Sequence, residues 1–236
     1  MAFADEPVDY ACRSFQCGWS GRQQAAADIA ARAQQLARGL GLIDPAFRSI
    51  RPSPMRKFRA GDPGPILDMT PAELTDRIER RGRYDPPRYP APVSSRGYEL
   101  SYRNDALGLD PSHLAISIRA GDCGPGWVEN RVRVSPHTDN LLWRNPERGI
   151  QILEAMVQAW NPEWACAFAT ISMPWSPDDE VNNARIRPWL AWTAKPLRPR
   201  PEPNYGRPYP YPFPLDKAGP AAEVRPWRGG ELRIWP

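Results

Sequence analysis

The sequence has little of the chemistry that most enzymes and metalloproteins use. It contains only two histidines, His113 and His137, and four cysteines in 236 residues. Neither histidine has a His or Cys neighbour at metal-ligand spacing, and there is no C-x-x-C motif. Four cysteines are also too few for a disulfide scaffold. We therefore expect no metal site and no cofactor.

The chain also lacks the short motifs that mark common active sites. It has no P-loop, no dinucleotide-binding glycine fingerprint, no G-x-S-x-G elbow and no H-E-x-x-H. Its three lysines do not complete the acidic-then-Lys pattern of a metal-dependent nuclease. Two carboxylates that meet in space remain an open route to acid–base chemistry. We expect a binding protein without catalytic residues rather than an enzyme.

Long apolar runs are absent as well. No stretch approaches the roughly 18 apolar residues of a membrane helix. Residues 1–7 have neither a basic region nor an apolar region of the kind that a secretory signal contains. The expectation is a cytoplasmic protein that does not bind membranes.

Proline and arginine, in contrast, are abundant. There are 30 prolines, and 28 arginines stand against three lysines. Proline and glycine together stay below the share of a low-complexity chain, so many fixed turns and extended connections are expected. The net charge of +4 is spread along the sequence, which argues against a nucleic acid as the binding partner. The hydrophobic share of 41% suffices for a core.

The first helix is expected early in the chain. Ser20 and Gln23 fit a capping box, in which each side chain satisfies an orphan backbone donor of the other. The Ala-rich segment 21–40 that follows has one apolar stripe. Gly41 fits the left-handed position after a helix end. These features predict a helix from about Gly21 to Leu40.

Two further helices have clear start signals. Thr70 is followed by Pro71 and Glu73, which predicts an N-cap, a first helical residue and an acidic first turn. Asn145 precedes Pro-Glu in the same way, and Asn161-Pro162 ends the third helix. In the third helix, an apolar stripe is predicted at Ile150, Leu153, Val157 and Trp160.

Alternating apolar residues predict antiparallel strands in the rest of the chain. Their connections are too short for helical crossovers, which argues against a doubly wound sheet. The predicted strands are 10–15, 98–103, 114–119, 132–134, an Ala-rich buried strand at 165–172, 189–194 and 231–235. We predict one α+β domain over residues 1–236, with a largely antiparallel or mixed sheet, about three helices and a proline-rich extended arm at 196–220.

Two segments are candidates for contact with a partner. Tyr209–Pro214 is either a polyproline ligand or, as we prefer, an arm packed on its own domain. Asp178, Asp179 and Glu180 form the most acidic run and lie near Trp175. A solvated loop is one interpretation of this run, and a contact patch for a basic partner is the other.

The order of several short segments resembles the immunity protein 52 family of bacterial polymorphic toxin systems. The likeness covers about residues 10–235, and the order and spacing of its motifs carry it. The motifs are Gly18-Trp19-Ser20-Gly21-Arg22, Asp44-Pro45-Ala46-Phe47, Ala159-Trp160-Asn161-Pro162-Glu163-Trp164, Trp189-Leu190-Ala191-Trp192 and Gly229-Gly230-Glu231-Leu232-Arg233-Ile234.

The resemblance implies an immunity protein that binds and neutralises a toxin encoded beside it, commonly a type VI secretion effector. Toxins linked to this family often have a restriction-endonuclease-like nuclease domain. An inhibitor of such a nuclease is expected to show an acidic face, whereas this chain is net basic. Either the acidic face is local, around Asp178, Asp179 and Glu180, or inhibition does not imitate DNA and works by covering the active site or by binding away from it. Our hypothesis is that Trp175, Asp178, Asp179 and Glu180 contribute to toxin binding.

Two alternatives remain open. One is an adaptor or chaperone that loads a secreted effector without blocking it. The other is an Arg-rich nucleic-acid-binding protein, for which the cluster between Arg77 and Arg83 is a candidate phosphate contact. A solvated helix face with Glu–Arg pairs is the simpler interpretation of that cluster. The oligomeric state is left open.

Overall fold

A single antiparallel sheet organises the chain. The computed structural model describes residues 12–53, 58–81, 96–106, 112–123, 130–136, 145–170, 186–194 and 220–235. These residues form nine strands and three α-helices, which confirms the predicted α+β class. Apart from Pro220, the proline-rich arm predicted at 196–220 lies outside the described residues.

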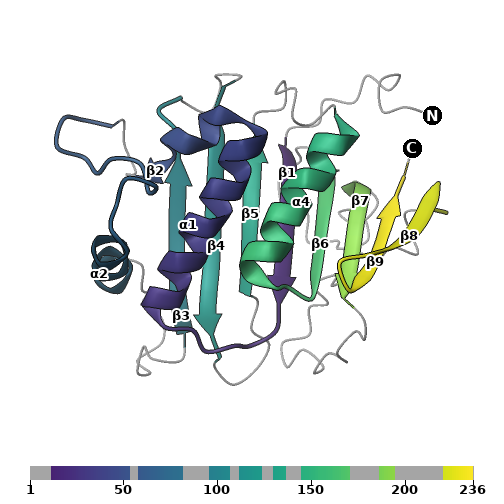
Figure 1. Ribbon diagram of the computed structural model, residues 1–236, viewed down its shortest axis with the longest axis horizontal. Helices are drawn as coiled ribbons and strands as arrows, with labels where there is room; N and C mark the ends of the chain where they lie inside the picture. Colours follow the sequence, from purple (N-terminus) through teal and green to yellow (C-terminus); the bar gives the residue numbers. More distant parts are fainter. Residues whose placement is uncertain are drawn as a thin grey trace, which may run out of the picture.

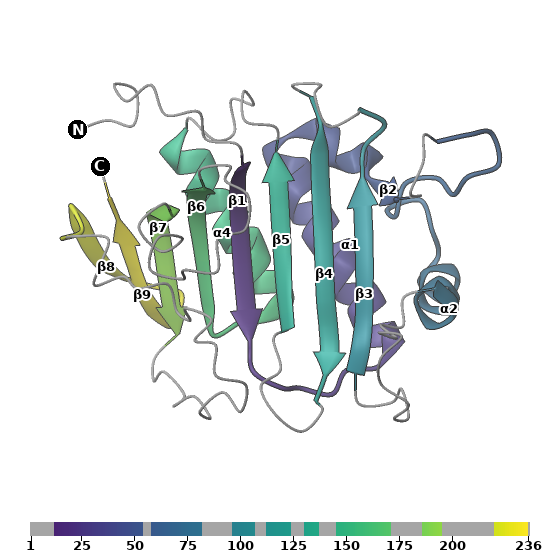
Figure 2. The same cartoon turned by 180° about the vertical axis from the view of Figure 1, so that it is seen from behind.

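The strands pair in the order β2-β3-β4-β5-β1-β6-β7-β9-β8, and every neighbouring pair is antiparallel. They are β1 Cys12–Trp19, β2 Arg51–Pro52, β3 Arg96–Arg103, β4 Leu114–Asp122, β5 Asn130–Pro136, β6 Trp164–Thr170, β7 Ile186–Ala194, β8 Glu223–Trp227 and β9 Gly230–Ile234. The first strand lies at the centre, between β5 and β6, so it joins the two halves of the sheet (Figure 2).

The helices lie on one side of this sheet. They are α1 Ala26–Ile43, α2 Pro71–Arg81 and α4 Pro146–Trp160, with a short 3₁₀ helix η1 at Pro45–Ser49. Helices α1 and α4 run side by side across the sheet, and α2 packs against α1 near the β2 edge (Figure 1). Within the described residues, the opposite face carries no helix (Figure 2). None of these helices is long and apolar enough to cross a membrane.

The start signals of α2 and α4 are confirmed. The Thr70 N–H donates to Glu73 Oε2 at 2.8 Å, and the Glu73 N–H donates to Thr70 Oγ1 at 3.2 Å. Asn145 Oδ1 accepts the Arg148 N–H at 3.2 Å. Asn161 ends α4 with φ of 45°, in the left-handed region that asparagine tolerates. In each helix a short polar side chain thus accepts one of the N–H groups that the first turn leaves without a backbone partner.

The predicted start of α1 is wrong. The helix begins at Ala26, after Ala25, which makes no side-chain cap. Ser20 does not cap it, because its hydroxyl donates to Glu163 Oε1 at 2.5 Å. The Arg22 guanidinium donates to the Trp160 carbonyl at 2.9 Å. Ser20 and Arg22 therefore bond to the end of α4 and to the residue after Pro162 instead of joining the helix.

The predicted end of α1 is also wrong. Gly41 lies inside the helix, where it is buried, and the helix continues to Ile43. Asp44 ends it: its N–H donates to the Leu40 carbonyl at 2.9 Å. Its side chain accepts the Ala46 N–H at 2.9 Å and so begins η1. Asp44 therefore caps the end of α1 and the start of η1, and no left-handed glycine is needed.

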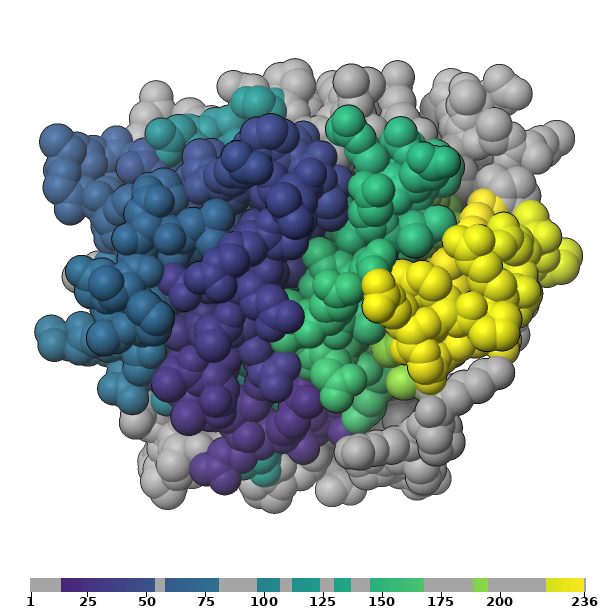
Figure 3. All heavy atoms as spheres, viewed as in Figure 1, coloured from purple at the N-terminus to yellow at the C-terminus, as the bar shows by residue number. Residues whose placement is uncertain are grey.

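The core lies between the sheet and the two long helices. Strand register aligns one row of apolar residues beneath α1 and α4: Leu100, Ile118, Val132, Cys17, Ala165, Trp192 and Leu232. The predicted Ala-rich strand is confirmed as β6, and it pairs with β1 and β7. Figure 3 shows the surface on the helix side of the sheet, where α1, α4 and the β8–β9 hairpin lie side by side.

Helix α4 is rotated slightly from the predicted stripe. Leu153 and Trp160 are buried as expected, but Ile150 and Val157 are only partly buried. Small and apolar residues on the adjacent positions complete the buried face: Gly149, Ile152, Ala155, Met156 and Ala159. The Trp160 ring stacks on Trp19 with centroids 5.2 Å apart. The stack ties the end of α4 to the end of β1.

A polar side chain fastens the ends of three strands. Asn130 is fully buried in β5. Its Oδ1 accepts the Asp122 N–H at 3.0 Å, and its Nδ2 donates to the Asp122 carbonyl at 3.0 Å. The same nitrogen donates to the Ser20 carbonyl at 3.1 Å. These bonds satisfy backbone groups that burial would otherwise leave without water.

The sheet has two strands that the periodicity did not predict, the two-residue β2 and β8. Strand β8 forms a hairpin with β9 through Arg228-Gly229, which have φ of 49° and 70°. Two successive residues with positive φ are typical of a tight hairpin turn. Strand β8 is the last strand of the sheet, and most of its side chains are exposed, so it shows no apolar alternation.

Candidate binding face

The residues predicted to contact a toxin cannot be placed in the fold. Trp175, Asp178, Asp179 and Glu180 lie outside the described residues, and so does His137. Their role stays a prediction. The described residues bring together no group of three His, Cys, Asp or Glu side chains that could hold a metal ion.

Two of the cysteines lie in the core. Cys17 of β1 and Cys166 of β6 are both buried. Burial raises the pKa of each thiol far above its ordinary range, because the thiolate would lose its hydration. Both are therefore held as neutral thiols, which are poor nucleophiles. Cys123, at the end of β4, is exposed.

Arginines gather on the sheet face that lies away from α1 and α4. In β5, Arg131 and Arg133 alternate with the buried Val132 and Val134, so their side chains leave the opposite face. Register places Arg119 of β4 directly opposite Arg131. It places Arg51 of β2 opposite Arg103 of β3 in the same way. We name Arg51, Arg103, Arg119, Arg131 and Arg133 the arginine face.

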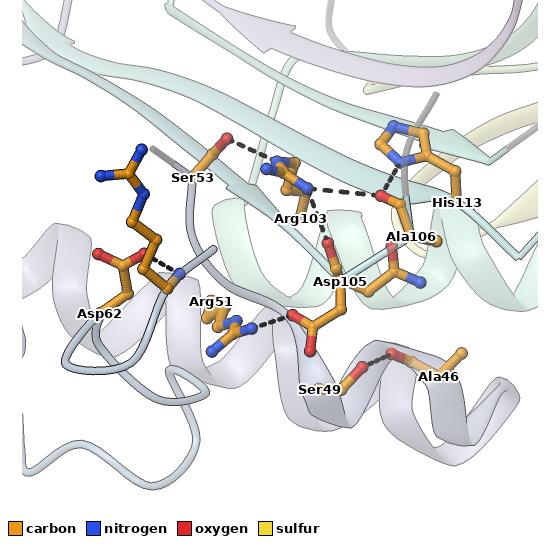
Figure 4. Close-up of polar contacts among 11 residues, drawn as sticks. Ala46, Ser49, Arg51, Ser53, Asp62, Arg103, Asp105, Ala106 and His113 are labelled. Atoms are coloured by element: carbon orange, nitrogen blue, oxygen red, sulfur yellow. Dashed lines mark hydrogen bonds and ion pairs between the residues drawn. The ribbon is translucent and has the colours of Figure 1, made fainter. Parts of the chain in front are cut away.

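Arg103 is fixed by hydrogen bonds at the corner between β2 and β3 (Figure 4). Its Nε donates to Ser53 Oγ at 3.1 Å. Its Nη1 donates to the carbonyls of Asn104 at 3.3 Å and Ala106 at 3.4 Å. The Ala106 carbonyl also lies 3.0 Å from His113 Nδ1. The turn between β3 and β4 thus holds this guanidinium in one orientation.

Arg51 lies beside Arg103 in the same corner. Its guanidinium forms an ion pair with Asp105, which is mostly exposed (Figure 4). The Phe58 ring packs against both arginines: its centroid is 3.7 Å from Arg51 Cζ and 4.3 Å from Arg103 Cζ. Contact with the ring stabilises the two cations and limits their rotamers.

Arg119 and Arg133, on the central strands of the arginine face, are each held by a neighbouring side chain. Arg133 Nε donates to Ser14 Oγ at 2.8 Å, and Ser14 is fully buried in β1. Arg119 Nη2 lies 3.4 Å from Asp122 Oδ2. The side chain of Arg119 keeps 29% of its surface exposed. These guanidiniums are therefore anchored in the sheet and still reach solvent.

The face carries charges of both signs. Glu99 of β3 lies opposite Arg119 and is exposed. Asp105 and Asp122 contact two of the five arginines, so carboxylates lie among the guanidiniums. The exposed Ser101 and Ser117 separate them. A guanidinium presents planar donors that fit a carboxylate or phosphate, so the face can bind an anionic surface.

The sequence contained one signal for this face. The alternation of arginines with Val132 and Val134 was visible, but it predicted only that β5 is half-buried. Convergence with Arg51, Arg103 and Arg119 depends on strand order and register, which the sequence pattern does not specify.

The cluster between Arg77 and Arg83 belongs in part to α2. Arg80 Nε lies 2.7 Å from Asp76 Oδ1, one turn away, which supports the interpretation as a solvated helix face. Arg77 and Arg80 also line a surface pocket with Asp68, Glu73 and Asp76. Three carboxylates in that pocket make it a poor phosphate site.

Comparisons with known proteins leave the family open. No protein-family model and no curated protein sequence matches this chain. Among solved structures, the chain is similar to the Pseudomonas aeruginosa T6SS protein PA0821, with a TM-score of 0.39 and 10% identity over 74% of this chain. The match covers 44% of that protein, less than half of its length. At this TM-score the likeness carries no argument about function, and the resemblance to the immunity protein 52 family stays a prediction.

Proposed function

We propose that this protein is a non-catalytic immunity protein that binds a cognate toxin and neutralises it. The toxin is a type VI effector with a restriction-endonuclease-like nuclease domain, encoded nearby and met in the cytoplasm. The observation that supports a binding role is the arginine face: an array of anchored guanidiniums on the side of the sheet away from α1 and α4.

Anchoring matters because binding must offset the entropy of ordering side chains. Each long side chain that is immobilised in an interface costs about 0.5–1.5 kcal/mol. Arg51, Arg103, Arg119 and Arg133 already have partners that restrict them before any complex forms. A surface prepared in this way suits tight, stoichiometric inhibition, in which interfaces bury about 1,600 Å².

The charge of this face also bears on how a nuclease would be inhibited. An inhibitor that imitates DNA presents carboxylates, whereas this face presents mainly guanidiniums. Inhibition through it therefore works by covering the active site or by binding elsewhere on the toxin. The acidic residues Asp178, Asp179 and Glu180 remain a second proposed contact.

Nucleic-acid binding is the second candidate, and the convergence of arginines on one face favours it. The sequence alone gave no such concentration of charge. This candidate predicts binding to arbitrary DNA or RNA with an affinity that falls steeply as salt rises, because phosphate contacts release counterions.

Co-expression with the product of the neighbouring gene tests the proposed function. If that product is toxic alone, an immunity protein restores growth and co-purifies with it. Co-purification without protection would instead indicate an adaptor that loads the effector. If this protein neither protects nor co-purifies, the result contradicts the proposal and favours nucleic-acid binding.

A further inference from the structure

We propose that the arginine face binds carboxylates on the surface of a folded protein partner, with Arg119 and Arg131 as the central contacts. This inference rests on the proposed function and specifies the toxin surface: it is acidic where it meets the sheet.

The arrangement of the arginines is the first argument. Arg119 and Arg131 occupy directly opposed positions of neighbouring strands, and so do Arg51 and Arg103. Side chains in such positions start about 5 Å apart, and like charges there destabilise a sheet. Two opposed arginine pairs on one face concentrate positive charge there. A partner carboxylate that lies between two guanidiniums would accept hydrogen bonds from both of them.

The carboxylates already present argue for a protein rather than a nucleic acid. Asp105 and Asp122 contact Arg51 and Arg119, and Glu99 lies opposite Arg119. A phosphate backbone would meet these three negative charges as well as the arginines. A protein surface can place its own basic groups against them, and such complementary patterns provide specificity between proteins.

The aromatic residues of this face point the same way. Proteins that bind single-stranded nucleic acid stack bases on accessible rings. The Phe58 ring is packed against two guanidiniums, and Trp164 of β6 is only 6% exposed. The Phe58 and Trp164 rings are therefore engaged in packing, whereas the guanidiniums of Arg119 and its neighbours reach solvent.

The partner is expected to cover the face and not to extend the sheet at an edge. Each edge strand contains a proline, Pro52 in β2 and Pro226 in β8, and β2 is only two residues long. Proline has no N–H to donate to an added strand, and it is common on protected sheet edges.

A pair of matched charge reversals tests the proposal. The face variant is R119E/R131E. The control variant is R38E/R148E, which changes the net charge by the same amount at exposed positions of α1 and α4, on the opposite side of the molecule. Circular dichroism and thermal unfolding verify that each variant folds. If the face variant does not, R119Q/R131Q replaces it, because glutamine removes the charge without introducing repulsion.

Binding to the purified neighbouring gene product is then measured. The face variant should bind on the order of 100-fold more weakly and fail to restore growth, since the reversed charges repel the partner's carboxylates. The control should bind like wild type. If wild type and both variants bind and protect equally, the arginine face is not the contact, although the immunity function stands.

Two fluorescent probes test the surface independently of the toxin: poly-glutamate and a single-stranded DNA of equal length. The proposal predicts that wild type and the control bind poly-glutamate and that the face variant does not. It also predicts that any weak DNA binding falls equally in both variants, as an effect of net charge. DNA binding that only the face variant loses, or equal binding of poly-glutamate by all three proteins, would overturn the proposal. If wild type does not bind the toxin but binds poly-glutamate more tightly than the face variant does, only the proposed immunity function is contradicted.

Discussion

Replacing Gly149 by alanine tests how closely α4 packs on the sheet. A Cβ at this position would lie 2.2 Å from Trp189 Cη2 and 3.1 Å from Leu190 Cδ1. Trp189 cannot easily move away, because it is buried and its ring meets Phe15 edge-on, with centroids 6.1 Å apart. The clash therefore involves a rigid side chain in the centre of the core.

Two opposing effects decide the outcome. Alanine favours the helix over glycine by about 1 kcal/mol. Overpacking a close-packed core costs about 1–3 kcal/mol. With a contact this short, we expect the upper part of that range, so Gly149→Ala should lower the free energy of unfolding by about 1–2 kcal/mol. Urea unfolding followed by circular dichroism measures it.

A second background separates the clash from other effects. In Trp189→Leu the ring is absent, so the same alanine should be neutral or stabilising through helix propensity alone. An equal loss of stability in both backgrounds, or a Gly149→Ala protein more stable than wild type, would refute the described contact between α4 and β7.

Three further predictions follow from particular contacts. The Thr70 N–H and hydroxyl hold the pKa of Glu73 below its usual range. The stability that the Glu73 carboxylate provides is therefore present above the ordinary pKa of glutamate and is lost as pH falls through the lowered value. Carbon NMR titration should show a low pKa of Glu73 in wild type and a higher one in Thr70→Ala. Mass spectrometry after native alkylation should find Cys123 modified and Cys17 protected, and equal labelling would contradict the burial of β1. Asn130→Ala should cost about 1–3 kcal/mol in urea unfolding, because the Asp122 N–H loses the Asn130 acceptor and the carbonyls of Asp122 and Ser20 lose the Asn130 donor. An unchanged midpoint would contradict that network.

Local sequence signals predicted the elements whose boundaries depend on local chemistry. The capping residues Thr70, Glu73 and Asn145 form the expected bonds within one turn of their helices. The alternation in β3, β4 and β5 reflects burial of one face under helices. The capping bonds join residues that are close in sequence, and the strand pattern repeats with a fixed period. Both signals can therefore be found in the sequence alone.

The errors arose where a distant contact or a neighbouring residue outweighed the local signal, or where a strand has no alternation. Ser20 is a good capping residue, but its hydroxyl donates a hydrogen bond to Glu163, which follows α4. Gly41 is a common helix end, but Asp44 supplies a better one three residues later. Strand β8 was missed because an exposed edge strand has no buried face and therefore no alternation.

The candidate binding face was the least predictable feature. Its arginines come from four strands: β3, β4 and β5 follow one another in the chain, and β2 precedes them, before α2. Their opposition depends on register, and no local pattern specifies which strands become neighbours. The acidic run at 178–180 was chosen instead because its charges are adjacent in sequence. That prediction is still to be tested.

The most direct test of the proposed function is a titration of toxin activity. The purified product of the neighbouring gene is assayed while this protein is added in measured amounts. An immunity protein that binds tightly should abolish the activity in proportion to its concentration, with complete inhibition when every toxin molecule is bound. Full activity in a saturated complex, or no complex at all, would contradict the account.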